Sequence, residues 1–284
     1  MSGFTRFIAF DWTGARGERH RAIQGAEADA GDGAPRLLRP GHRWSRSEVL
    51  AFIRGVADRG ERALIGIDCS FSLPFVDRGS YFPGEPEPGG PRALWAEIDA
   101  VGASDTDLTG HAYIEHRRRH FWTGAADGVQ KPFARLRVAE AIHRERRMGN
   151  PASPYVLVGA SQVGKATLSG MRLLHRLDGA LPIWPFDPLP GRGAVLVEIY
   201  CQTFALDGGF RGKLRTKSAL NEALDRLGSK PVGADIPEQF DDHVGDALIS
   251  AAGLRRVSAI PDYWSPPAMT EEVRCTEGWT FGIL

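Results

Sequence analysis

Three short apolar runs in this chain each end in a carboxylate. Residues 7–10 lead directly into Asp11, residues 63–67 into Asp68, and residues 194–197 into Glu198. Apolar runs of this length that are rich in β-branched residues are typical of buried strands. A carboxylate at the end of a buried strand is costly unless something neutralises it. A divalent metal ion would do so, and the three acids therefore indicate metal-dependent chemistry.

A fourth carboxylate belongs to a predicted helix near the C-terminus. Asp235, followed by Pro237 and Glu238, is a start signal for this helix. Asp242 and Asp246 lie four residues apart and therefore share one helix face. Small residues around them would let the helix lie close to a sheet. We therefore expect Asp246 to approach the strand carboxylates and to share a cation with them.

The pattern of elements predicts an α/β fold with a mixed central sheet flanked by helices. After the first strand, residues 19–28 and 36–39 are expected to form two further strands. Ser45 or Ser47 then caps a predicted helix that ends at Gly60. The strand that ends at Asp68 follows this helix. Antiparallel strands, a crossover helix and a parallel strand together bury both faces of a sheet.

The chain is interpreted as a single domain, residues 1–284, with a mainly helical insertion over residues 76–150. Residues 81–91 are rich in proline and glycine, and helices are expected near residues 92–100 and 132–148. The insertion is interpreted as a lid or a substrate platform. From residue 155 the regular pattern resumes, with a strand, a glycine-rich turn and a helix to Leu177. Another helix is expected near residues 218–227.

Composition narrows the functional classes only slightly. The chain has 284 residues, with 35 basic and 35 acidic side chains, so its bulk charge does not indicate a nucleic-acid-binding protein. Its three cysteines show neither a pairing pattern nor zinc-type spacing. The N-terminus lacks signal-peptide design, and no apolar run reaches membrane-spanning length. We expect a cytoplasmic protein with no membrane partner, and the sequence does not reveal its oligomeric state.

The insertion carries a basic cluster interleaved with aromatic residues. Its members are Arg117, Arg118, Arg119, Lys131, Arg135, Arg137, Arg144, Arg146 and Arg147, with Phe121, Trp122 and Phe133 nearby. Arginines with aromatics can hold phosphates and stack bases. A solvated helical surface explains the same pattern. DNA or RNA is therefore a possible partner, and the two interpretations remain open.

The acids suit hard divalent ions, since Mg²⁺ and Mn²⁺ prefer carboxylate oxygen and water. Two such ions about 4 Å apart can activate water and stabilise the leaving oxygen of a phosphodiester. The candidate ligands are Asp11 bridging the metals, Glu198 and Asp246 on one metal each, Asp68 assisting, and Asp242 on the same helix face. His243 is expected to be a packed helical histidine rather than an acid or base. Caps or ion pairs are the alternative for each acid taken singly.

Four segments carry a resemblance to a known family. They are residues 7–14, residues 67–74, residues 197–200, and the segment Asp242-His243-x-x-Asp246-Ala247-Leu248. In this order they resemble a bacterial family of predicted RNase H-like nucleases, and Glu277-Gly278-Trp279 fits the same family. The last segment is also similar to the final acidic helix of Holliday-junction resolvases. The resemblance implies an RNase H-like core whose metal ligands are Asp11, Asp68 or Glu198, and Asp246.

A competing motif lies at residues 159–165, where Gly159, Gly164 and Lys165 have the spacing of a phosphate-binding loop. The next residue is Ala166, where a magnesium-binding Ser or Thr is required. We therefore expect a weaker role in which Gln162, Lys165 and Thr167 border the site and contact a substrate phosphate. A tight turn whose glycines only permit close packing is the alternative.

The sequence thus predicts metal-dependent hydrolysis of phosphodiester bonds in nucleic acid, with Mg²⁺ or Mn²⁺ as cofactor. Two alternatives stay open because one fold serves many functions. A nucleotide-dependent phosphotransferase or ATPase could use the same core. A non-catalytic binding protein could keep the fold without a working metal site.

Overall fold

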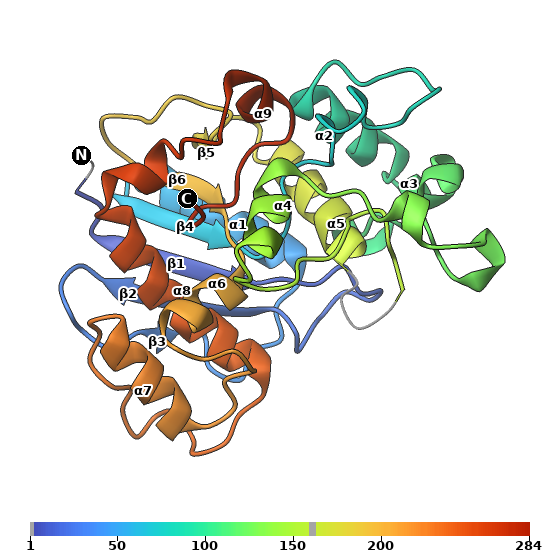
Figure 1. Ribbon diagram of the computed structural model, residues 1–284. Helices are drawn as coiled ribbons and strands as arrows, with labels where there is room; N and C mark the ends of the chain where they lie inside the picture. The colour runs from blue at the N-terminus through green and yellow to red at the C-terminus, as the bar shows by residue number, and fades with distance from the viewer. Residues whose placement is uncertain (1–2, 159–162) are drawn as a thin grey trace.

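A computed structural model describes residues 3–158 and 163–284 of the chain. Within these residues, six strands form one mixed sheet in the order β3-β2-β1-β4-β6-β5 (Figure 1). The strands are β1 (Arg6–Asp11), β2 (Gln24–Asp29), β3 (Arg36–Leu37), β4 (Ala63–Ile67), β5 (Ile183–Trp184) and β6 (Val195–Glu198). β2 runs antiparallel to β1 and β3, whereas β1, β4, β6 and β5 run parallel to one another. The predicted α/β class with a mixed sheet is confirmed.

Helices cover both faces of the sheet. They are α1 (Arg46–Asp58), α2 (Pro91–Val101), α3 (His111–His116), α4 (Val138–Glu145), α5 (Val163–Arg176), α6 (Cys201–Asp207), α7 (Lys217–Arg226), α8 (Asp242–Ser258) and α9 (Glu271–Thr276). Short 3-10 turns occupy Thr106–Leu108, Arg118–His120, Ala125–Asp127, Lys131–Phe133 and Pro261–Trp264. α8 crosses β1 and β2 on one face, and α6 packs on α8. Among these helices, none is long and apolar enough to cross a membrane.

Strand alternation divides the core into two apolar clusters. Ile8 and Phe10 of β1 belong to the cluster that includes α1 and α5, whereas Phe7 and Ala9 belong to the cluster that includes α8. Successive side chains of a strand point to opposite faces. Asp11 continues the series of Phe7 and Ala9 and therefore lies on the face that α8 covers.

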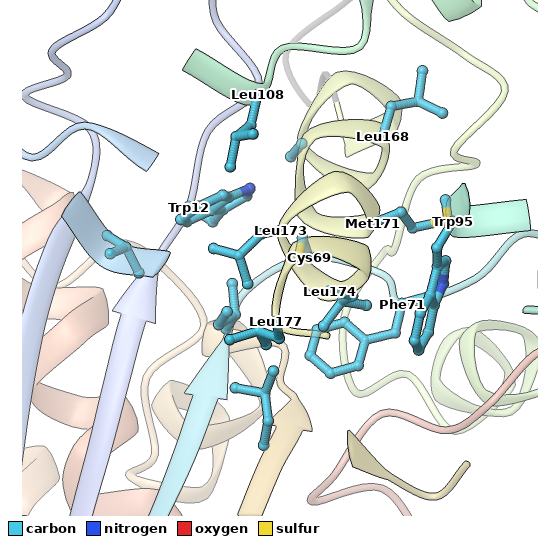
Figure 2. Close-up of a cluster of buried hydrophobic side chains, with 14 of the residues drawn as sticks. Trp12, Cys69, Phe71, Trp95, Leu108, Leu168, Met171, Leu173, Leu174 and Leu177 are labelled. Carbon is cyan, nitrogen blue, oxygen red and sulfur yellow. The ribbon is translucent and has the colours of Figure 1, made fainter. Parts of the chain in front are cut away.

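α5 lies very close to the ends of β1 and β4. Trp12 donates its indole N–H to Ser169 Oγ at 3.0 Å, and its ring lies beside α5 in the apolar cluster of Figure 2. Gly170 of α5 makes the approach possible, because a Cβ atom at this position would lie 2.3 Å from Cys69 Sγ. Cys69 thus faces α5, as the expected alternation with Asp68 requires.

Small residues allow α8 to approach the sheet and its neighbours in the same way. A Cβ atom on Gly245 would lie 2.2 Å from the carbonyl oxygen of Leu214, and one on Gly253 would lie 2.3 Å from the ring of Phe204. The expected close packing of this helix is therefore present. The backbone of residues 213–215 is held directly against the first turns of α8.

Several predicted boundaries are wrong. Residues 155–158 do not form a strand of the sheet: Val156 makes one isolated bridge with Trp122, through bonds from Trp122 N to Tyr155 O and from Leu157 N to Trp122 O. The last long helix does not start at Asp235. Its cap is Asp241, because residues 238–240 instead hydrogen-bond to residues 215–217. β5, α6 and α9 were not predicted.

Residues 76–150 contain α2, α3, α4 and 3-10 turns connected by loops. α2 matches the helix expected near residues 92–100. The helix expected near residues 132–148 is shorter, because Arg137 is extended, with φ −70° and ψ 161°, and α4 begins only after it.

Of the two candidate caps for α1, Ser45 is the cap, and its hydroxyl accepts a hydrogen bond from Glu48 N.

Replacement of Gly170 by alanine tests the close approach of α5. The new methyl group would overlap Cys69, so we expect Gly170→Ala to lower the free energy of unfolding by about 1–3 kcal/mol. Gly55→Ala is the matched control in α1, because its Cβ would meet only the flexible end of Arg59. It should raise stability by up to about 1 kcal/mol. Urea unfolding measures both, and equal effects would contradict this packing.

Candidate metal centre

Asp11 and Asp68 are brought together by the register of β1 and β4. Phe10 pairs with Ile67 in the parallel ladder, and Asp68 N donates to Phe10 O at 3.0 Å. Asp11 follows Phe10 and Asp68 follows Ile67, so the two aspartates lie at the same level of the sheet. Since neighbouring residues at one level share a face, both carboxylates lie on the α8 side.

Cys201 completes a group that could hold a metal ion. One carboxylate oxygen from each of Asp11 and Asp68 and the Sγ atom of Cys201 all lie within 4.8 Å of one another. Cys201 is the first residue of α6, and two residues separate it from the end of β6. Cys201 was not among the ligands predicted from the sequence. Its position three residues after Glu198 was the available signal.

Burial and mutual repulsion make these carboxylates hard to ionise. Burial, the Asp11 charge and the Asp246 charge raise the pKa of Asp68 to about 8, against the Cys201 hydrogen bond, which lowers it. Burial raises the pKa of Asp11 to about 6, against the hydrogen bond from His243. A cation among these groups would favour their ionised forms. The group is thus suited to binding positive charge.

His243 contacts the centre directly, so the expectation of a packed helical histidine is wrong. Its Nδ1 atom lies 2.6 Å from Oδ2 of Asp11, while the other oxygen of Asp11 accepts from Trp12 N at 2.9 Å. The hydrogen bond to Asp11 raises the pKa of His243 above its usual value, against burial, which lowers it. His243 therefore stabilises the ionised form of Asp11. His243 reaches Asp11 from the start of α8, which also carries Asp242 and Asp246.

Asp246 reaches the same region from α8, paired with Lys213. Lys213 Nζ lies 2.5 Å from Oδ2 of Asp246, and the Asp246 charge raises the pKa of Asp11 and of Asp68. Burial acts to lower the pKa of Lys213, but attraction to Asp246 and Asp11 raises it overall. Asp242 instead lies 3.3 Å from an Arg215 nitrogen. No local sequence signal indicates the pairing of Lys213 with Asp246, because the two residues are 33 positions apart.

Glu198 is directed away from Asp11 and Asp68. It pairs with Ile67, one residue before Asp68, and therefore points to the opposite face of the sheet. There its oxygens accept from Arg137 at 2.5 and 2.8 Å, from Phe71 N at 2.7 Å, and from the Thr280 hydroxyl. The predicted ligand is thus the centre of a buried ion-pair network.

Arg137 and Glu277 anchor this network. Arg137 is 1% exposed and also binds Glu140, and these carboxylates raise its pKa although burial acts to lower it. Glu277, from the C-terminal motif, accepts from Phe75 N, Val76 N and Val138 N at 2.7–2.9 Å. It therefore ties the start of the insertion to the start of α4.

The predicted phosphate contacts are only partly described. Gln162 lies outside the described residues, as does most of the 159–165 loop. Thr167 is fully buried in α5, and its hydroxyl has no hydrogen-bond partner among the described residues. A Cβ on Gly14 would lie 2.0 Å from the Lys165 backbone. Lys165 therefore lies beside the turn that follows β1.

A cavity of about 380 Å³ opens beside Asp68. Its walls come from the turn after β1, the first turn of α5, the segment after α4, and the β6–α6 connection. Asp68, Glu198 and Lys165 all line it. The cavity thus extends from Lys165 to Asp68, the residue of the metal centre that lines it.

No protein-family model matches the chain, no curated protein matches it, and no solved structure matches it. The assignment of function therefore depends on the geometry of the centre.

The raised pKa values predict how stability depends on pH. In the metal-free protein, the folded state retains protons on Asp68 and Asp11 that the unfolded chain releases above about pH 4. The free energy of unfolding should therefore fall as pH rises from 4 to 8, by at most about 1.4 kcal/mol per pH unit for each proton. Asp68→Asn should flatten this slope. Urea unfolding at a series of pH values measures it, and an unchanged slope would contradict the raised pKa of Asp68.

Glu198→Gln separates a structural role from metal binding. Loss of this charge leaves Arg137 with only Glu140 as a buried partner, so we expect a loss of about 3 kcal/mol in unfolding free energy. Glu222→Gln breaks an exposed pair with Arg226 and should cost less than about 1 kcal/mol. Calorimetric Mn²⁺ affinity should change less than twofold in Glu198→Gln. A loss as large as that in Asp68→Asn would instead make Glu198 a ligand.

Proposed function

We propose that this protein is a divalent-metal-dependent hydrolase of phosphodiester bonds in nucleic acid, acting at a centre formed by Asp11, Asp68 and Asp246. The observation that carries the proposal is the convergence of Asp11 and Asp68 at one level of two adjacent parallel strands. Burial raises the pKa of both groups. A site that disfavours its own negative charges is a site for a cation.

The arrangement supports an RNase H-like core for this proposal. The resemblance assigns metal binding to a first-strand aspartate, a later-strand acid and a helix aspartate. Asp11 ends β1, Asp68 follows β4, and Asp246 belongs to α8, which packs on β1. Asp68 rather than Glu198 takes the later-strand role, because Glu198 is held by Arg137.

Mg²⁺ or Mn²⁺ suits the carboxylates, and Cys201 adds a softer sulfur donor at the same place. When bound, the metal would supply Lewis acidity and lower the pKa of a water molecule near the phosphate. His243 orients Asp11 and can hold a proton at Nε2. Lys213, beside Asp246, offers a positive charge for a phosphate oxygen.

Metal binding is the first test of this function. We expect calorimetric titration to show a Mn²⁺ site, with affinity at least tenfold lower in Asp11→Asn and in Asp68→Asn because each removes a ligand. Asp225→Asn is the control, since Asp225 lies exposed on α7. Unaltered Mn²⁺ binding in both site variants would contradict the assignment.

Hydrolysis is the second test. With Mn²⁺ or Mg²⁺ the protein should cleave at least one of single-stranded DNA, duplex DNA, RNA, an RNA–DNA hybrid or a branched junction. Asp11→Asn should lower the rate at least a hundredfold, while Asp225→Asn keeps the wild-type rate. Mn²⁺ binding without cleavage of any substrate would favour the non-catalytic binding protein.

A further inference from the structure

The cavity beside Asp68 has the size of a small-molecule site. Its volume of about 380 Å³ falls in the range of ligand pockets, roughly 300–1,000 Å³. Apolar and aromatic groups form much of its wall, including Trp12, Ile199 and Tyr200. The ring of Tyr200 packs edge-on against His143, with 5.3 Å between ring centroids. A fixed aromatic wall of this kind suits a planar ligand, because a base can stack on it.

Polar groups are distributed around the same wall. Ser70 donates to Glu140 at 3.2 Å, and both residues line the cavity. His143 also lines it, and its Nε2 atom is buried with no hydrogen-bond partner in the described parts of the chain. The exposed amide of Asn150 lies at the rim. A ligand with donor and acceptor groups would find polar partners on this wall in Ser70, Glu140 and Asn150.

Charge determines which part of a nucleotide enters the cavity. The cavity wall carries three carboxyl groups, Asp68, Glu140 and Glu198, and two cations, Lys165 and Arg137, of which Arg137 is held between Glu140 and Glu198. A phosphate placed deep in the cavity would therefore face carboxylates. At the Asp68 rim the same phosphate would meet the proposed metal. The uncharged nucleoside is thus the part that fits the cavity.

More than half of the insertion's basic cluster is held in ion pairs. Within the described residues, five of its nine members are paired: Arg117 with Glu85 and Glu97, Arg118 with Asp127, Arg119 with Glu85, Arg135 with Asp77, and Arg137 with Glu140 and Glu198. The other four, Lys131, Arg144, Arg146 and Arg147, are exposed. Phe121 is fully buried. These contacts weaken the interpretation of the cluster as a phosphate and base platform. Recognition is therefore better served by an enclosed site for one nucleotide.

We infer that the cavity binds the nucleoside of one unpaired nucleotide, whose phosphate lies at the Asp11–Asp68 centre. This inference rests on the proposed function and specifies its substrate: an unpaired nucleotide, at a single-stranded end or in a short oligonucleotide. A base inside a continuous duplex would have to leave the stack before it could enter such a cavity.

Calorimetry with defined probes tests the inference. In the presence of Mn²⁺, at least one of AMP, GMP, CMP and UMP should bind at least tenfold more tightly than ribose 5-phosphate, which lacks a base. Ala152→Trp and Ala15→Trp place a large side chain in the cavity from two different walls. Each should abolish this preference while leaving Mn²⁺ affinity unchanged. Ala141→Trp, on the exposed surface of α4 and outside the cavity lining, should retain the preference.

The outcomes separate the two proposals. If the protein binds Mn²⁺ but shows no tenfold preference for any of the nucleotides, the cavity inference is overturned and the metal centre stands. A preference that persists in both cavity-filling variants, with folding verified by thermal unfolding, also overturns it. If Mn²⁺ does not bind, the proposed function fails, and free nucleosides test the cavity alone. Binding to the wild type but not to Ala152→Trp supports the inference, and no binding overturns it.

Discussion

The rest of this structure is arranged around the repulsion between two carboxylates, those of the buried Asp11 and the half-buried Asp68. The parallel register of β1 and β4 places them at one level of the sheet and on one face. Two positive or protonatable groups compensate for this charge from other segments: His243 on Asp11 and Lys213 on Asp246. Gly245 lets the Lys213 segment lie directly against α8. The close packing at Gly245 therefore also positions Lys213 for its ion pair with Asp246.

On the opposite face of the sheet, a buried carboxylate is neutralised by an arginine of the protein itself. Glu198 ends β6 but points away from the centre, where Arg137 neutralises it together with Glu140. This network is satisfied within the protein, so it can fix the position of α4 and of the cavity wall. The Asp68 side retains a carboxylate whose pKa is about 8. Among the described residues, Glu198 is neutralised by an arginine and Asp68 is not, and this contrast distinguishes a structural acid from a candidate metal ligand.

The sequence pattern predicted the strands that end at Asp11, Asp68 and Glu198, because apolar runs followed by turns are local signals. It did not separate Glu198 from the other two acids, because a one-residue difference in register reverses the face of a side chain. Cys201 and His243 reach the centre from helices, and Lys213 reaches it from the loop between α6 and α7. A single sequence does not specify how these segments pack. The start of α8 was misplaced because residues 238–240 pair with residues 215–217, a contact between segments distant in sequence. Composition likewise gave no sign that five members of the insertion's basic cluster are held in ion pairs.

The most direct test of the central claim is a crystal structure of the protein soaked in Mn²⁺, with anomalous scattering used to locate the ion. We predict an anomalous peak bound by the carboxylates of Asp11 and Asp68, with Asp246 or Cys201 as a further ligand and Lys213 displaced from Asp246. An anomalous peak elsewhere, or none at Mn²⁺ concentrations that saturate the site in solution, would contradict the account.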